Sequence, residues 1–190
     1  ELSAGARSAE HRFGYTEPEV RRLVEVAARA AAGRRGRLSV VVKDGGIPTV
    51  SALWRDVAAA VAREHGVEAK LVNVDLAAYQ IVQHPREFDV VVAPNLFGDV
   101  LADVAGVLLR SRGLGVSGNL AADGRAVYQT NHGCAHDLAG LDRANPVGQI
   151  LALAMLLRES MGLEGEADQI ERSVVAAWEA GWRTADLAEP

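Results

Sequence analysis

The apolar positions of this chain follow two spacings, and each spacing predicts one kind of element. A helix is predicted to begin after Thr16, because Thr16 can cap it and two glutamates flank Pro18 in its first turn. The helix runs to Gly33 and has apolar side chains on one face. The run "LSVVVK" (38–43) is almost continuously apolar and β-branched, which is typical of a strand covered on both faces. The segment "VSALWRDVAAAVAREHG" (50–66) returns to the helical spacing.

The alternation of strands and helices continues along the chain. We expect a strand in "AKLVNVD" (69–75), a short helix in "LAAYQIVQHP" (76–85) and another buried strand in "FDVVVAP" (88–94). The later elements are expected to be an apolar helix at 98–112, a glycine-rich turn at 113–120, a short strand at 126–130, a long polar loop at 131–146, a strongly apolar helix at 147–162 and an amphipathic helix at 166–181. This order predicts an α/β layer fold.

Composition and charge narrow the class of protein. Hydrophobic residues make up 49% of the 190 residues, which is enough for a packed core. The net charge of -5 gives no reason to expect nucleic acid or an anionic membrane as a partner. The single cysteine, Cys134, excludes an internal disulfide framework. No apolar run reaches the roughly 18 residues of a membrane span, so we expect a soluble cytoplasmic protein.

Two aspartates interrupt one of the apolar segments. Asp99 and Asp103 are four residues apart, so on a helix both carboxylates would project from one face and repel each other. A divalent cation would offset that repulsion, and Mg²⁺ or Mn²⁺ suits a site made only of oxygen ligands. Asp75, at the expected carboxyl end of the strand 69–75, offers a third carboxylate. For each of these residues, a capping or solvated aspartate is the alternative interpretation.

Several blocks of the sequence resemble one enzyme family. The block "FDVVVAPNLFGDVLADVAGVL" is similar to the metal-binding signature of the isocitrate and isopropylmalate dehydrogenases, the β-decarboxylating dehydrogenases. "VVVK", "NVDLAAYQIVQHPREFD", "GLGVSGNL", "HGCAHDLAGLDRANP" and "GWRTADL" resemble the other blocks of that family, in the same order. The resemblance covers the whole chain but only the later half of a full member. It implies the family's three-layer α/β/α fold, here without the N-terminal half, and the start at Glu1 agrees with a missing upstream part.

The resemblance implies a role for each carboxylate and for one lysine. Asp99 and Asp103 match the residues that hold Mg²⁺ or Mn²⁺ in one subunit of a dimer. Asp75 matches a metal-binding carboxylate that reaches the site from the other subunit. Lys43 matches the catalytic lysine, which is also supplied across the dimer and acts with Asp75 to move protons as the substrate's hydroxyl is oxidised.

The resemblance also assigns the polar loop to the cofactor. His132, Gly133 and Asn145 match the positions that hold the adenosine of the dinucleotide. Asp137 and Leu138 stand where NADP-dependent members tend to carry Lys and Tyr. An acidic residue there would repel a 2′-phosphate and accept a hydrogen bond from a free ribose hydroxyl, so NAD is the expected cofactor.

The implied activity is an NAD- and divalent-metal-dependent oxidation, with decarboxylation, of a 2-hydroxy acid that bears a neighbouring carboxylate. We expect a homodimer in which residues 1–109 form the dimerising and catalytic part and residues 110–190 form the C-terminal part of the cofactor-binding domain. The missing N-terminal half would be supplied by a longer chain or by a partner chain. No nucleic acid or membrane is expected as a partner.

The chain departs from the family pattern at a few positions. Gly45 stands where an asparagine is usual, and with Gly46 it makes the surroundings of Lys43 roomier and more mobile. Gln129 and Thr130 replace a usual Glu–Pro pair, and His136 replaces a usual proline in the loop. The sequence leaves open the roles of three residues, Arg110, Arg112 and His136.

Two other functions remain open beside the enzyme. The chain could be a non-catalytic or regulatory subunit of the same fold, or a truncated dimeric scaffold that binds only a metal or a nucleotide. The regulatory subunit is weakened by the presence of Lys43, Asp75, Asp99 and Asp103 together, because a site without a function would tend to lose costly charges. The missing N-terminal half favours the truncated scaffold.

Overall fold

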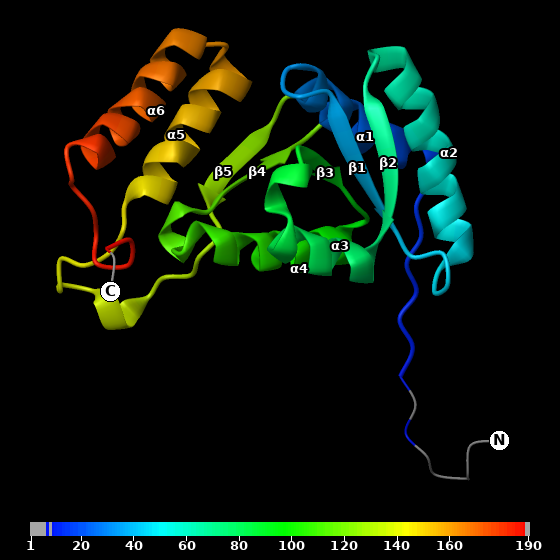
Figure 1. The fold of residues 1–190 in the computed structure, drawn as a ribbon, viewed down its shortest axis with the longest axis horizontal. Coiled ribbons are helices and arrows are strands. Elements are labelled where there is room, and N and C mark those ends of the chain that lie inside the picture. Colours follow the sequence, from blue (N-terminus) through cyan, green and yellow to red (C-terminus); the bar gives the residue numbers. More distant parts are fainter. Residues whose placement is uncertain (1–6, 8, 189–190) are drawn as a thin grey trace. The chain divides into compact units, whose positions relative to one another are not determined.

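The computed structural model describes residue 7 and residues 9–188 (Figure 1). The chain divides into two compact units, Glu1–Ala102 and Asp103–Pro190, and each is described by itself below. The division falls inside helix α4 (Asn95–Gly106), earlier than the expected division after residue 109. The assignment of catalysis to the first part and of the cofactor to the second part stays a prediction.

The first unit is built around a parallel sheet of three strands in the order β2-β1-β3. Its elements along the chain are α1 (Glu17–Ala32), β1 (Arg37–Val42), α2 (Pro48–His65), β2 (Glu68–Asn73), α3 (Val74–Gln83), β3 (Val90–Val92) and the start of α4. Helices α1 and α2 pack against each other and against the sheet (Figure 1). The predicted α/β fold is confirmed, and the structure shows that its sheet is parallel.

The core of the first unit explains why β1 is apolar along its whole length. Leu38, Val40 and Val42 are buried in one cluster with α1 and α2. Val41 is equally buried, and because side chains alternate along a strand it belongs to the opposite face, where α3 packs. Trp54 of α2 is the largest fully buried side chain and is 1% exposed. The sequence predicted this burial of the strand on both faces correctly.

The predicted start of α1 is also confirmed. The Glu19 carboxylate accepts hydrogen bonds from the backbone N–H and from the hydroxyl of Thr16, each at 2.8 Å. The bond from the Thr16 backbone is the main reason why the pKa of Glu19 lies below its usual value. Through these two bonds the Glu19 carboxylate caps the first turn of the helix.

The expected end of the strand before Asp75 was wrong. Strand β2 ends at Asn73, and α3 begins directly at Val74, so Asp75 lies in the first turn of a helix. Asn73 has extended backbone angles at the N-cap position, and an acidic residue in the first turn is favoured by the helix dipole. The strand predicted at 88–94 is likewise shorter, since only Val90–Val92 pair with β1 and only Val92 is buried.

The predicted helix at 98–112 and the predicted turn at 113–120 also need correction. Helix α4 spans Asn95–Gly106 and is followed by a 3₁₀ turn at Val107–Leu109. The glycine-rich segment contains a strand, β4 (Val116–Leu120). A Cβ at Gly118 would lie 3.1 Å from Met155 Sδ, so the glycine there allows α5 to approach the strand closely rather than forming a turn.

Besides the end of α4, the described part of the second unit contains one hairpin and two long helices. Its elements are β4, β5 (Ala126–Thr130), α5 (Val147–Met161) and α6 (Glu164–Glu179), with β4 and β5 antiparallel. Helix α5 packs on the hairpin and on α6 (Figure 1). None of the helices in the part of the chain that the structure describes combines the length and the apolar character of a membrane span.

A cluster of charges joins α5 to α6. The Arg158 guanidinium, 25% exposed, contacts the carboxylates of Glu164, Asp168 and Glu171 at 2.7–3.1 Å. The hydrogen bonds that Arg158 donates to the Glu171 carboxylate are the largest cause of the raised pKa of Arg158. The fully buried apolar side chains on these two helices are small, and the ion-pair network adds a polar contact between them.

Asp89 gives the first unit a defined response to acid. Its side chain is fully buried and accepts hydrogen bonds from Arg34 Nε and from the backbone N–H of Arg35, both at 2.9 Å. The hydrogen bond from the Arg34 guanidinium, together with those from the backbone N–H groups of Arg35 and Arg37, lowers the pKa of Asp89 from 3.8 to about 2. A carboxyl with a depressed pKa stabilises the folded state fully above its unfolded value, and this stabilisation is lost as the pH falls from 3.8 toward 2.

We therefore expect Asp89→Asn to lower the midpoint of thermal unfolding at pH 7 and to flatten the acid dependence of that midpoint. The measurement is a series of thermal melts between neutral and acidic pH. The control is Asp56→Asn, at an exposed position of α2, which should follow the unmodified chain throughout. Equal midpoints for Asp89→Asn and the unmodified chain at pH 7 would contradict this role.

Candidate active site

Lys43 and Asp75 meet at the carboxyl edge of the sheet in the first unit. Lys43 directly follows β1 and Asp75 lies just beyond β2, so the parallel pairing of these strands brings both residues to one edge. Lys43 Nζ lies 3.0 Å from Asp75 Oδ1. The hydrogen bond from Lys43 is the main cause of a lowered pKa at Asp75. A proton donor and an ionised carboxylate are thus in direct contact at a solvent-accessible position.

Two side chains that the sequence analysis missed hold the backbone around Lys43. The backbone N–H of Lys43 donates to Ser51 Oγ at 3.0 Å, and Ser51 is fully buried in α2. The backbone N–H of Asp44 donates to Asn73 Oδ1 at 3.2 Å. Asn73 is the first residue of the family-like block "NVDLAAYQIVQHPREFD", two residues before Asp75, so its place in that block near a strand end was the available signal.

The two glycines after Lys43 differ in their surroundings. A Cβ at Gly45 would meet no atom within 4 Å, so this position faces open space. A Cβ at Gly46 would lie 3.1 Å from Lys43 Cγ, so a side chain there would press on the lysine. The Gly45–Gly46 pair therefore leaves room beside Lys43, as the sequence suggested.

Asp99 and Asp103 lie one turn apart on α4, as their spacing predicted, and both are exposed. Arg112 Nη2 lies 3.9 Å from Asp103 Oδ2, and both of these side chains are largely exposed. Arg112 is therefore a largely exposed charge beside Asp103. Among the described residues, no group of three or more His, Cys, Asp or Glu side chains is close enough to hold a metal ion.

The carboxylate oxygens on α4 are nevertheless the kind of ligand that a hard divalent cation prefers. Asp99 and Asp103 offer carboxylate oxygens only, at a spacing that a single ion can bridge. The third predicted ligand, Asp75, is held by Lys43 within the first unit. The predicted metal site would therefore need a carboxylate from another copy of the chain, and its assignment stays a prediction.

The predicted cofactor loop is an exposed, irregular segment in the second unit. His132, Gly133 and Asp137 are all exposed, and a short 3₁₀ turn at His136–Leu138 includes the last of them. His132 Nδ1 lies 2.9 Å from the carbonyl oxygen of Gly133, so this nitrogen carries the proton. The free carboxylate of Asp137 has the chemistry needed to accept hydrogen bonds from ribose hydroxyls. His136 is exposed in the same loop, and the structure gives it no further role.

Asn145, the last predicted cofactor residue, is held by a network that the sequence analysis did not anticipate. Its Nδ2 donates to Asp186 Oδ2 at 3.0 Å, and its Oδ1 accepts from the backbone N–H of Val147 at 3.0 Å. Asp186 Oδ2 also accepts a hydrogen bond from the Ser111 hydroxyl. Partial burial raises the pKa of Asp186, but the hydroxyls of Ser111 and Thr184 and the Asn145 amide together outweigh it, so the pKa of this carboxyl lies below its usual value.

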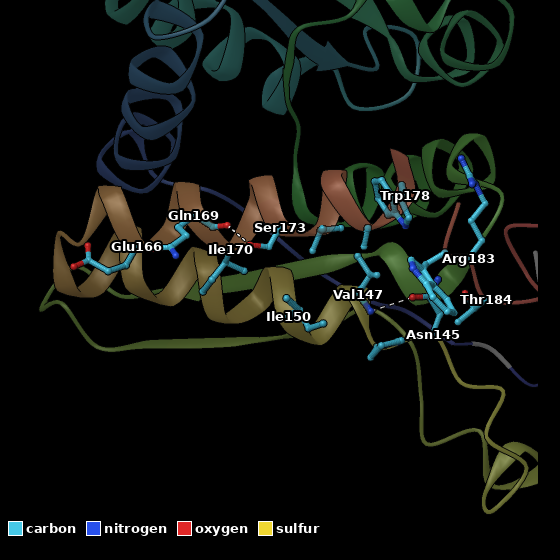
Figure 2. Close-up of a pocket in the computed structure, with 14 residues that line it drawn as sticks. Asn145, Val147, Ile150, Glu166, Gln169, Ile170, Ser173, Trp178, Arg183 and Thr184 are labelled. Carbon is cyan, nitrogen blue, oxygen red and sulfur yellow. Dashed lines mark hydrogen bonds between the residues drawn. The ribbon is translucent and has the colours of Figure 1, made fainter. Parts of the chain in front are cut away.

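A groove of about 720 Å³ lies along α5, α6 and the segment after α6 (Figure 2). Its lining is mainly apolar and includes Ile150, Ile170 and Trp178, and Asn145 lies at one end of it (Figure 2). Of the predicted site residues only Asn145 lines this groove. The residues that line the groove belong to the second unit, and the Lys43–Asp75 pair belongs to the first.

Comparisons with known proteins point to one family. The family model described as isocitrate/isopropylmalate dehydrogenase matches residues 3–190. The 3-isopropylmalate dehydrogenase of Burkholderia pseudomallei (strain 1710b) is 44% identical over 188 residues, which are 98% of this chain and 53% of that protein. The corresponding enzyme of Priestia megaterium (strain DSM 319 / IMG 1521) is 44% identical over 176 residues, 92% of this chain and 47% of that protein.

Solved structures give the same result. The crystal structure of isocitrate dehydrogenase from Methylococcus capsulatus superposes on this chain with a TM-score of 0.87 at 33% sequence identity. The match covers 99% of this chain and 56% of the isocitrate dehydrogenase chain. A β-decarboxylating dehydrogenase from Thermococcus kodakarensis superposes with a TM-score of 0.76 at 34% identity, over 92% of this chain and 52% of that chain. The chain spans about half the length of the curated relatives it matches.

Proposed function

Because the chain belongs to the isocitrate/isopropylmalate dehydrogenase family, we propose that it carries the metal-binding and NAD-binding half of a β-decarboxylating dehydrogenase. The observation that carries the proposal is the contact between Lys43 Nζ and Asp75 Oδ1 at 3.0 Å. A dehydrogenase of this chemistry must remove a proton from the substrate's hydroxyl, and a lysine paired with a carboxylate at an accessible sheet edge is suited to that task.

In the proposed reaction, each of these side chains has a separate role. Lys43, once it has released a proton to solvent, takes the proton of the substrate hydroxyl, and the Asp75 carboxylate, whose pKa is lowered by its hydrogen bond from Lys43, orients the lysine. Ser51 and Asn73 fix the backbone from which Lys43 projects. When bound, the cation on Asp99 and Asp103 supplies Lewis-acid polarisation of the substrate's oxygen, and NAD supplies the hydride acceptor.

The choice of NAD over NADP is supported by Asp137. Its exposed carboxylate in the loop with His132 and Gly133 would repel a 2′-phosphate and would accept from the free ribose hydroxyl of NAD. Asn145 would contact the adenosine from the end of the same loop.

The substrate class follows from the chemistry of the site. A 2-hydroxy acid with a carboxylate on the neighbouring carbon can chelate a cation and lose CO₂ after oxidation. Relatives named 3-isopropylmalate dehydrogenase make 3-isopropylmalate the first candidate, and the similar isocitrate dehydrogenase structure makes isocitrate the second. The open space at Gly45 leaves room for a variable group beside Lys43.

A homodimer is part of the proposal. Large apolar side chains are exposed on α3 and α4, and they include Tyr79, Val82, Leu96 and Val100. Exposed apolar surface of this kind is typical of a face that another chain covers. In the proposed dimer one subunit provides Asp99 and Asp103, and the other provides Lys43 and Asp75. The half of the relatives' length that this chain does not span would come from a longer chain or from a partner chain.

The first test is a thermal shift of the chain in EDTA, in Mn²⁺ and in Mn²⁺ with NAD. A ligand that binds only the folded state raises the unfolding midpoint, so we expect a rise with Mn²⁺ and a further rise with NAD. A rise with neither ligand would contradict the enzyme proposal and would favour the regulatory subunit or scaffold.

Asp103→Asn tests the metal assignment in the same assay. We expect it to abolish the Mn²⁺-dependent rise and to leave the metal-free chain as stable or more stable, because it removes repulsion between two carboxylates one turn apart. Glu159→Gln, which neutralises an exposed carboxylate on α5, should keep the full response. An unchanged response to Mn²⁺ in Asp103→Asn would show that the metal assignment is wrong.

A further inference from the structure

Asp186 has no role in the proposed reaction, yet it joins three separate segments of the second unit. It lies beyond α6, and its Oδ2 accepts hydrogen bonds from Asn145 Nδ2, at 3.0 Å, and from the Ser111 hydroxyl. These partners are 41 and 75 residues away in the chain. One carboxylate oxygen therefore ties the turn before β4 and the start of α5 to the segment after α6.

The contacts of Asn145 define a single orientation of its amide group. Its Oδ1 accepts from the backbone N–H of Val147, and its Nδ2 donates to Asp186. A rotation of the amide by half a turn would set Nδ2 against the Val147 N–H and Oδ1 against the Asp186 carboxylate, two unfavourable contacts at once. An amide offers two N–H donors and an oxygen with two lone pairs, so one donor and one lone pair remain for a ligand.

Packing around Asn145 is as restrictive as its hydrogen bonds. A Cβ at Gly113 would lie 2.6 Å from the Cβ of Asn145, a distance that only glycine avoids. The backbone N–H of Gly113 donates to Ser111 Oγ at 3.0 Å. The hydroxyl that donates to Asp186 thus also fixes the glycine against which Asn145 packs.

We propose that Asp186 is a positioning residue for the dinucleotide, because its carboxylate holds the Asn145 amide in the one orientation that the adenosine of NAD meets. The inference rests on the proposed function, in which Asn145 contacts the adenosine. Asp186 itself does not touch the cofactor in this proposal. Its effect reaches NAD through the direction of the free donor and the free lone pair of Asn145.

The test combines one readout without ligand and one with NAD. In the first, the side-chain amide signals of Asn145 are recorded by ¹⁵N-edited NMR for the unmodified chain and for Asp186→Ala. In the second, the Kd for NAD is measured by calorimetry. We expect Asp186→Ala to shift the Asn145 amide signals and to raise the Kd about tenfold, as for the loss of one charge-assisted hydrogen bond. The Mn²⁺-dependent thermal shift should persist and shows that the variant is folded.

Two further variants sharpen the comparison. Asp186→Asn keeps an oxygen that can accept from Asn145, so it should restore most of the amide signal and of the affinity. Asp123→Ala removes another hydrogen-bonded aspartate, on the turn between β4 and β5, and should change neither readout. If Asp186→Ala were too unstable to study, Asp186→Asn and Ser111→Ala would test the same network.

The outcomes separate this inference from the proposed function. Unchanged Asn145 signals in Asp186→Ala would overturn the positioning role. Shifted signals with an unchanged Kd would overturn its link to the cofactor. An unmodified chain that does not bind NAD would overturn the proposed function, and with it the link to the dinucleotide, before any variant is compared.

Discussion

Replacement of Lys43 by methionine is expected to lower the rate of substrate oxidation by about three orders of magnitude, the usual range for the loss of a general acid–base group. Methionine keeps the length and the apolar stem of lysine but cannot take up a proton. Lys43 Nζ is 3.0 Å from Asp75 Oδ1, so the variant also leaves that carboxylate without its cation. The measurement is NADH formation from 3-isopropylmalate and from isocitrate.

Arg55→Met is the matched control for Lys43→Met. Arg55 pairs with Asp44, and its side chain is 40% exposed, close to the 38% of Lys43. We expect this variant to keep its activity, because exposed ion pairs contribute little and Arg55 has no part in the proposed chemistry. The Mn²⁺-dependent thermal shift should also persist in Lys43→Met, since lysine is not a metal ligand. Substantial turnover in Lys43→Met would contradict the catalytic role.

Trp54→Ala should have the largest effect on stability, with a loss of about 3–5 kcal/mol in the free energy of unfolding. Trp54 is 1% exposed and belongs to the cluster between the sheet and helices α1 and α2. Its ring meets the edge of Tyr15 with centroids 5.6 Å apart. The Tyr15 hydroxyl in turn accepts a hydrogen bond from the backbone N–H of Asn95 at 3.2 Å. The cavity that Trp54→Ala leaves beside Tyr15 would therefore also loosen the start of α4. Urea denaturation measures the loss.

Trp54→Phe should cost much less than Trp54→Ala. The indole Nε1 of Trp54 is buried and has no hydrogen-bond partner within the described ranges, 7 and 9–188. A buried donor without a partner is unfavourable, so its removal offsets part of the lost contact area. Trp182→Ala, at a side chain that is 77% exposed, should change little. Equal losses for Trp54→Ala and Trp182→Ala would contradict the assigned place of Trp54 in the core.

Local patterns predicted most of the helices and the central strand. Thr16 and Glu19 identified the start of α1, and the β-branched run of β1 identified a strand buried on both faces. The spacing of Asp99 and Asp103 predicted that one helix carries both. In each case the determining interactions lie within one element, so a short stretch of sequence contains them.

The failures have a different physical origin. The glycines of the segment 113–120 predict a turn locally, whereas Gly118 lies in strand β4 and leaves space for the approach of Met155 from α5. The contact of Asp186 with Ser111 spans 75 residues, and no local pattern encodes it. Asp75 was expected in the wrong element, yet its meeting with Lys43 followed from the order of the strands. The catalytic, metal and cofactor roles of these residues stay predictions.

The hydrogen bonds of Asp89 also bear on how the first unit forms and how long it lasts. They join positions 52–55 residues apart, and the intervening chain contains α2, β2 and α3. Closing a loop of that length is entropically costly, so these bonds are expected to form late, after the transition state for folding. Interactions of that kind leave the folding rate almost unchanged and slow unfolding. Asp89 thus acts chiefly on the lifetime of the folded unit, and hence on its resistance to proteases that cleave opened chains.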